Sequence, residues 1–246
     1  LTHITPRGGI VLTSGDRTAT NVNIKNLVDN KKEDAKYLSQ SAGANGWTGL
    51  SNTTTDSDQL TIQFIAPVDM MNCEGEKVFK GDLVVQRYFL RTYNSTSKDD
   101  SSVASLGLAC DANDPNIKAN ISSDPESITG FGTATNLGEV IIPRVDQFKV
   151  QVLAKLNSNY RYYSLNDYLA VASSSTAQIP EIQLIRISVL IRSQVKTESV
   201  ANEPNKTFVM LGENVTLKTA AVGNSNRYSR AVYETSISLR NGLKES

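Results

Sequence analysis

The residues of this chain that could do chemistry are few and widely spaced. The single histidine, His3, lies near the beginning of the chain, and any Ser-His or Cys-His nucleophile–base pair would have to use it. No glycine-rich phosphate-binding motif and no G-x-S-x-G motif occurs. A Ser-Lys pair has no local signature and stays open. The sequence therefore predicts no catalytic, cofactor-binding or metal-binding residues, no small-molecule substrate and no enzymatic activity.

Two groups of polar and charged residues could bind a metal ion or a partner, or could simply face solvent. Asp111, Asn113 and Asp114 resemble the first half of a calcium-binding loop, but the glycine and glutamate that complete that pattern are missing. We interpret them as a solvated acidic turn. Five arginines on or beside the most regular strand-like stretches could form a basic strip for DNA phosphates or an acidic partner. A solvated sheet face with mixed charges is the alternative that we favour for these five: Arg186, Arg192, Arg227, Arg230 and Arg240.

The two cysteines, Cys73 and Cys110, allow only one intramolecular disulfide. Both lie in polar, turn-like sequence, and their spacing does not fit a zinc site. Two buried free thiols are the alternative. We expect a disulfide, which would indicate an oxidising compartment.

The length and the net charge of the chain limit the kinds of protein that it can be. A chain of 246 residues can build its own hydrophobic core, as one large domain or two small ones. We expect a single globular domain over residues 1–246. The 25 basic and 25 acidic side chains cancel, so direct nucleic-acid binding is not expected. No stretch is long and apolar enough to cross a membrane, and the first residues lack the pattern of a signal peptide.

The elements that would position these residues are mainly strands. In Ile182–Arg192 the aliphatic residues Ile185, Ile187, Val189 and Ile191 share one parity, while Arg186, Ser188 and Arg192 share the other. Because side chains alternate between the faces of a strand, this pattern predicts a buried aliphatic face and a wet face. Ala231–Asn241 alternates in the same way, and the two stretches can pair in an antiparallel sheet.

Further strands and two helices follow from similar patterns. We expect a hairpin of Leu83–Tyr93 with Val103–Cys110, whose base the disulfide would tie, and a strand over Val145–Leu156. Lys, Glu and Ala residues favour a short helix at Asp29–Gln40, and Ser164 could cap a helical turn that ends at Ala172. The predicted class is α+β, dominated by strands, with an antiparallel sheet at its centre.

Several ordered blocks resemble PilW-type minor pilins of bacterial type IV pili. The segment RYSRAVYETSISLRN at residues 227–241 is similar to the end of that family. Val145–Val150 and Ile185–Ser193 are similar to its V-x-x-F/M-x-V and V-R-V-x-L-L-x-R-S strands. Ser57–Phe64 followed by Asn72–Gly75 matches a third block. Together the blocks extend over most of the chain.

The resemblance implies a fold, a cellular location and a role. It implies a type IV pilin-like domain, preceded in the family by an apolar helix that this sequence does not include, so membrane contact would be through that helix only. It implies an inner-membrane protein with a periplasmic domain that later enters the extracellular pilus. Its role would be to prime pilus assembly near the tip and to support twitching motility, adhesion and DNA uptake.

The resemblance also implies the partners, which are other minor pilins, the major pilin and a PilY-type tip adhesin. Loops at Asp111–Gly138 and Asn23–Asn52 are the expected contact surfaces. Two other classes stay open: a minor pseudopilin of a type II secretion system, and a secreted β-rich adhesin or binding domain.

Overall fold

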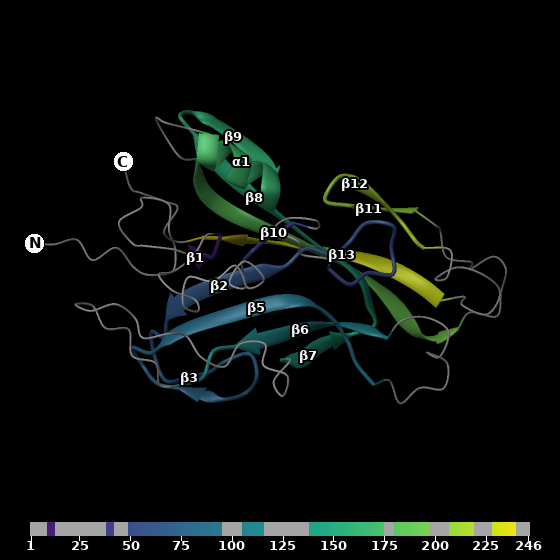
Figure 1. The fold of residues 1–246 in the computed structure, drawn as a ribbon, viewed down its shortest axis with the longest axis horizontal. Coiled ribbons are helices and arrows are strands. Elements are labelled where there is room, and N and C mark those ends of the chain that lie inside the picture. The colour runs from purple at the N-terminus through teal and green to yellow at the C-terminus, as the bar shows by residue number, and fades with distance from the viewer. Residues whose placement is uncertain are drawn as a thin grey trace, which may run out of the picture. The chain divides into compact units, whose positions relative to one another are not determined.

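The structure is a computed structural model, and strands dominate the residues that it describes (Figure 1). None of the described helices is long and apolar enough to cross a membrane. The described residues are 9–12, 38–41, 49–94, 105–115, 138–174, 180–196, 207–218 and 228–239. The predicted helix at Asp29–Gln40 therefore lies mostly outside them, as does His3.

Two larger sheets are formed. The first has the strand order β1-β2-β5-β6-β7. The second has the order β13-β10-β8-β9, and each of its neighbouring pairs is antiparallel. The strands of the first sheet are β1 (Gly9–Ile10), β2 (Leu60–Ile65), β5 (Leu83–Thr92), β6 (Leu106–Ala112) and β7 (Glu139–Pro143). Those of the second are β8 (Val145–Leu156), β9 (Asn159–Ser164), β10 (Glu181–Lys196) and β13 (Tyr228–Ser238).

Two short hairpins and one helix complete the described elements. The hairpins are β3–β4 (Met70–Met71 and Lys77–Val78) and β11–β12 (Thr207–Met210 and Glu213–Thr216). The helix α1 (Leu165–Ser174) follows β9 directly. Within the described residues, the predicted strand-dominated fold with antiparallel sheets is confirmed.

The chain divides into two compact units. One comprises Leu1–Gln40, Leu60–Tyr88 and Cys110–Glu139. The other comprises Ser41–Gln59, Phe89–Ala109 and Val140–Ser246. The expectation of a single globular domain over residues 1–246 stays a prediction.

The helix α1 begins where the sequence places its cap. The hydroxyl oxygen of Ser164 accepts a hydrogen bond from the main-chain N–H of Asp167 at 3.1 Å, and the Ser164 hydroxyl donates to the Asp167 carboxylate at 2.8 Å. Such caps satisfy N–H groups that have no partner inside the helix. At the other side of α1 the Tyr168 hydroxyl donates to the carbonyl oxygen of Pro180 at 2.7 Å. Burial raises the pKa of Tyr168 to about 12, so its hydroxyl remains a donor at neutral pH.

The pairing of the two central strands is confirmed. β10 and β13 are antiparallel from the pair Leu184–Ser238 to the pair Arg192–Arg230. On its other edge β10 pairs with β8, whose side chains Phe148, Val150, Val152 and Ala154 are all buried, as their spacing predicts. The predicted hairpin is also present, since β5 and β6 are neighbours and the Tyr93 N–H donates to the Ser105 carbonyl oxygen at 2.9 Å.

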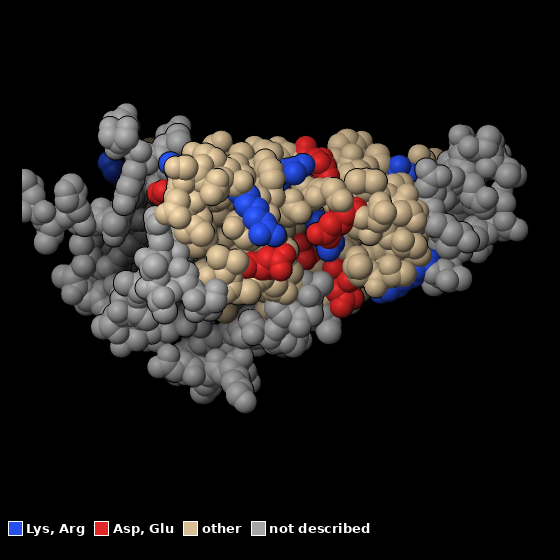
Figure 2. All heavy atoms as spheres, turned by 90° about the horizontal axis from the view of Figure 1, so that it is seen from above, with Lys and Arg blue, Asp and Glu red and all other residues tan. Residues whose placement is uncertain are grey.

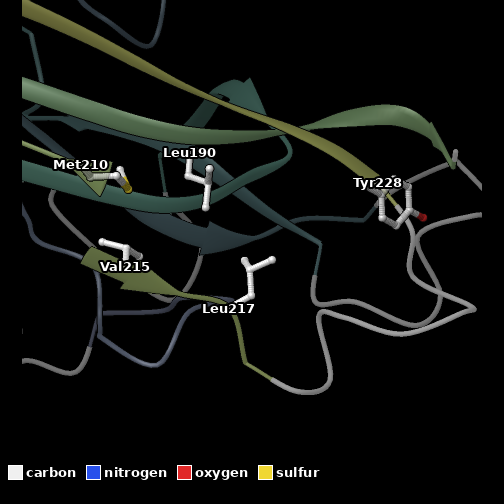
Figure 3. Close-up of a cluster of buried hydrophobic side chains, with 5 residues drawn as sticks. All are labelled: Leu190, Met210, Val215, Leu217 and Tyr228. Atoms are coloured by element: carbon white, nitrogen blue, oxygen red, sulfur yellow. The ribbon is translucent and has the colours of Figure 1, made fainter. Parts of the chain in front are cut away.

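The predicted faces of β10 are wrong over its C-terminal half. Ser188, Leu190 and Arg192 are almost completely buried, whereas Ile187 is only half-buried. The reason is a covering element that periodicity does not show. Leu190 packs in a cluster with Met210, Val215 and Leu217 of the β11–β12 segment and with Tyr228 (Figure 3). The β11–β12 hairpin thus keeps water from the face of β10 that alternation assigns to solvent.

Candidate functional site

Asp146 lies at the centre of a buried ionic cluster. Its Oδ1 accepts a hydrogen bond from Nη1 of Arg192 at 2.8 Å, and its Oδ2 accepts one from Nε of Arg230 at 2.6 Å. The side chains of all three residues are 0 % exposed. The Nδ2 of Asn52 donates to the same Oδ1 at 2.8 Å. One carboxylate therefore holds two strands and a distant segment together.

A bulge in β8 turns the Asp146 side chain toward these partners. Leu190 of β10 lies opposite Gln147, and the next residue, Ile191, lies opposite Val145, so Asp146 has no direct opposite on β10. Arg144, two residues before, has the left-handed φ of 63°. A bulge adds local twist and redirects a side chain, and such features are often found beside functional sites.

Arg192 and Arg230 are direct cross-strand partners in the β10–β13 pair. Like charges opposite each other in a sheet are normally unfavourable. Here Asp146 bridges them, and the guanidinium of Arg192 also lies 5.5 Å from the centre of the Tyr228 ring. Nη1 of Arg230 donates to the carbonyl oxygen of Tyr228 at 3.3 Å. The positive charge of the cluster is thus shared among a carboxylate, an aromatic face and a main-chain dipole.

The segment 51–58 is bound to the same region of β8. The hydroxyl groups of Ser51 and Ser57 donate to Oε1 of Gln147, at 2.5 and 2.8 Å. The main-chain N–H of Asp58 donates to the carbonyl oxygen of Phe148 at 2.9 Å. On its other side the segment meets the strand β12, since the Thr54 N–H donates to the Thr216 carbonyl oxygen at 2.7 Å. This polar loop therefore bridges β8 and β12, and it is buried at both of its ends and exposed at Thr54 and Thr55.

The basic strip, the less favoured alternative for these arginines, is not present in the described part of the chain. Arg192 and Arg230 point into the buried cluster, and Arg186 forms an ion pair with Glu234 at 3.2 Å. Arg227 and Arg240 lie outside the described residues. On the face shown in Figure 2, basic and acidic side chains lie next to each other within a largely uncharged surface. The favoured interpretation, a solvated sheet face, is therefore wrong for Arg192 and Arg230, whose side chains are fully buried.

The two cysteines expected to pair are joined in the structure. Cys73 follows β3, Cys110 lies in β6 and is fully buried, and their Cα atoms are 6.0 Å apart. The carbonyl oxygen of the Asn72 side chain accepts hydrogen bonds from the N–H groups of Glu74 and Glu76, at 3.0 and 2.9 Å. The disulfide thus fixes a compact turn on β6.

Glu74 is a partly buried carboxyl beside this disulfide. Its Oε2 accepts a hydrogen bond from the N–H of Ala112 at 3.0 Å. Burial raises the pKa of Glu74 above its usual value; the bond from Ala112 opposes the rise, and the negative charge of Asp111 adds to it.

The acidic residues that resemble half of a calcium loop end the strand β6. Asp111 is buried and pairs with Nη2 of Arg87 at 2.5 Å. The side-chain oxygen of Asn113 accepts a hydrogen bond from the N–H of Val85 at 2.6 Å. Our interpretation as a solvated turn is therefore wrong for Asp111 and Asn113. Among the described residues, no group of three or more His, Cys, Asp or Glu side chains could hold a metal ion.

A small pocket lies where the tip of the β11–β12 hairpin meets the sheet. Its volume is about 140 Å³, and Lys149, Gln151 and Glu213 are among its lining residues. Nζ of Lys149 pairs with Glu213 at 3.4 Å, and Nε2 of Gln151 donates to the carbonyl oxygen of Leu211 at 3.2 Å. Ligand pockets usually enclose roughly 300–1,000 Å³. This pocket is smaller than that range, and its polar groups already have partners within the protein.

The cluster around Asp146 and the sheet that carries it lie in a segment with known relatives. Residues 127–241 match the family of the type IV pilus-assembly protein W, PilW. The match includes β7 to β13 and all three ionic residues of the cluster, Asp146, Arg192 and Arg230. It excludes the disulfide and the segment 51–58. The resemblance that the sequence shows to PilW proteins is therefore confirmed, over the C-terminal part of the chain.

Solved structures and curated sequences provide two further comparisons. The chain is similar to a type IV-like pilin from Thermus thermophilus at 15 % sequence identity and a TM-score of 0.38, over 80 % of this chain and 87 % of that one. No curated protein sequence matches the chain.

Sequence reasoning missed the ionic cluster. Asp146 lies in the block Val145–Val150, Arg192 lies in Ile185–Ser193, and Arg230 lies in the block at residues 227–241. The three residues lie far apart in the sequence, and no local pattern indicates that their side chains meet. The alternation in these blocks predicts strands and favours a solvated face for the arginines.

Proposed function

We propose that this chain is a structural minor pilin that helps to prime type IV pilus assembly and takes a place at or near the pilus tip. The observation that carries the proposal is the PilW match over residues 127–241. Through the pilus the chain would support twitching motility, adhesion and DNA uptake. We assign it no catalytic role.

The proposed partners are other minor pilins, the major pilin and a PilY-type tip adhesin. A subunit of a fibre works through its contacts, and it must present them in a fixed geometry. The Asp146 cluster supports this role because it ties β8, β10 and β13 to one another through buried side chains. The proposed location is the inner membrane with the domain in the periplasm, and then the pilus.

Deletion of the gene tests the proposal. We expect fewer surface pili, measured as the major pilin that shearing releases from cells, and restoration by the intact gene. Normal piliation in the deletion strain would refute the assembly role. A strain that keeps its pili but loses type II secretion would instead identify a pseudopilin.

The expected contact surfaces are tested by shortening a loop. Most of Asp111–Gly138 and Asn23–Asn52 lies outside the described residues, so their role as contacts stays a prediction. A gene with residues 116–137 shortened should produce a folded protein that restores piliation poorly. Full restoration would place the contacts elsewhere on the domain.

A further inference from the structure

The strand β13 has an open outer edge. It stands at the end of the order β13-β10-β8-β9, and within the described ranges no main-chain group of residues 232–238 bonds to anything beyond β10. The N–H of Leu239 donates to the carbonyl oxygen of Gln183 at 2.9 Å, which fixes the phase of the ladder. In an antiparallel pair the main-chain groups alternate in direction. The main-chain N–H and C=O groups of Tyr233, Thr235 and Ile237 therefore point toward β10.

The alternate residues turn their main-chain groups outward, and these residues are Val232, Glu234, Ser236 and Ser238. An open row of alternating N–H and C=O groups is complementary to one kind of occupant, another extended strand.

Features that usually protect an edge strand are missing from this one. Residues 232–238 contain no lysine and no proline, which natural edges commonly use to prevent pairing. The one charged side chain, Glu234, lies over the sheet face, where it pairs with Arg186 and accepts the N–H of Leu211 at 2.6 Å. Two large apolar side chains stand exposed beside the edge, Tyr233 at 61 % and Ile237 at 47 %. The edge thus lacks these protective residues and carries two exposed apolar side chains.

We propose that the occupant is a second copy of this chain, paired antiparallel through β13 with Thr235 on the two-fold axis. Thr235 is the midpoint of the open run, so this register pairs the whole run with itself. Val232 then lies opposite Ser238 of the second copy, and Glu234 opposite its Ser236. These pairs exchange about eight main-chain hydrogen bonds, two for each hydrogen-bonded pair.

The side chains support the same register. Tyr233 lies opposite Ile237 of the second copy, and Thr235 lies opposite its own equivalent. Aromatic–β-branched and Thr–Thr pairs are favourable across strands. A shifted register that places Glu234 opposite Glu234 of the second copy brings two negative charges together, which is unfavourable. The net charge of zero adds no general repulsion between two copies.

The result is one continuous sheet through both copies. A single pair of strands buries less surface than the roughly 1,600 Å² of a standard interface, so we expect a weak dimer that forms at high concentration. This pairing does not depend on the proposed role in the pilus, because it follows from the edge alone.

The variant Thr235→Cys tests the register on the purified chain. Both native cysteines are in a disulfide, so the new thiol is the only free one. Opposed residues of a non-hydrogen-bonded pair have Cα atoms about 4.5 Å apart, which a disulfide can span. We expect mild oxidation to give a covalent dimer in non-reducing electrophoresis. Ser229→Cys, exposed on the same strand but outside the open run, is the matched control and should remain monomeric.

The variant Ser236→Pro tests the edge. It removes an N–H that points outward, so the fold should remain while self-association, measured by sedimentation at increasing concentration, is lost. If circular dichroism shows that this variant unfolds, Tyr233→Lys at an exposed site replaces it. A chain that stays monomeric at all concentrations would overturn the proposal, as would equal cross-linking of both cysteine variants. A monomeric chain whose binding to another minor pilin is lost with Ser236→Pro would assign the edge to that pilin instead.

Discussion

Arg192 lies directly opposite Arg230 across the β10–β13 pair, and both guanidinium groups are buried. Burial of a charge without compensation costs several kcal/mol, so two opposed cations are stable together only because Asp146 accepts from both. The cluster explains why this end of the sheet keeps a bulge and a left-handed residue, Arg144, which a regular strand would avoid. We expect it to be a critical point for the stability of the C-terminal sheet.

Asp146→Asn should destabilise the protein by about 3–5 kcal/mol, the usual cost of removing one partner of a buried ion pair. The amide cannot neutralise the two guanidinium groups that remain buried. Urea unfolding followed by circular dichroism measures the change. Glu213→Gln is the matched control, because the Glu213 side chain is 53 % exposed in its pair with Lys149 and such pairs contribute less than about 1 kcal/mol. Equal losses in the two variants would show that the Asp146 cluster is not important for stability.

Leu190→Ala should destabilise the protein more than Ile187→Ala. Leu190 is fully buried against the β11–β12 segment, and truncation of such a side chain costs about 2–5 kcal/mol. Ile187 is half-buried and leaves less of a cavity. Thermal unfolding of the two variants measures the difference. If Ile187→Ala were the more destabilising variant, the buried face of β10 would be the one that alternation predicts.

The comparison of these two residues shows what the sequence can predict. Period-two alternation correctly located β8, β10 and β13 and the antiparallel pairing of the last two, because these properties depend on local pattern. Which face of β10 is buried depends on where residues 207–218 pack, and nothing in the alternation of β10 contains that information. The aliphatic face of a strand is expected to be the buried one. The polar residues Ser188 and Arg192 are nevertheless buried here, because another segment of the chain covers their face.

The Asp146 cluster was beyond sequence reasoning for a similar reason. Its partners come from positions 52, 192 and 230, and a bulge aims the carboxylate at them. Arginines on a strand are usually solvated, so the sequence favours a solvated sheet face with mixed charges for these residues. In contrast, the disulfide could be expected, because two cysteines allow a single pairing.

Replacement of both Cys73 and Cys110 by serine should destabilise the protein by about 4 kcal/mol, the entropy that closure of this loop removes from the unfolded chain. The loss should appear as a lower denaturation midpoint. A thiol titration of the unfolded, unreduced protein should find essentially no free thiol. Two reactive thiols would show that the bond does not form in solution.

Glu74→Gln should stabilise the protein at neutral pH, and the gain should vanish in acid. The folded state raises the pKa of Glu74 above its usual value of 4.5, mainly through burial, so the folded protein binds the proton more tightly than the unfolded chain does. Stability therefore falls as the pH rises through the usual pKa and then through the raised one, and it is recovered below both. The glutamine keeps a carbonyl oxygen for the N–H of Ala112 and carries no charge to bury. Denaturation midpoints of both proteins, measured from pH 3 to pH 8 in roughly unit steps, should converge at the acid end. Glu181→Gln removes a charge from an exposed position and is the control for net charge. If Glu181→Gln gives the same gain with the same dependence on pH, the effect belongs to overall charge and not to the buried carboxyl.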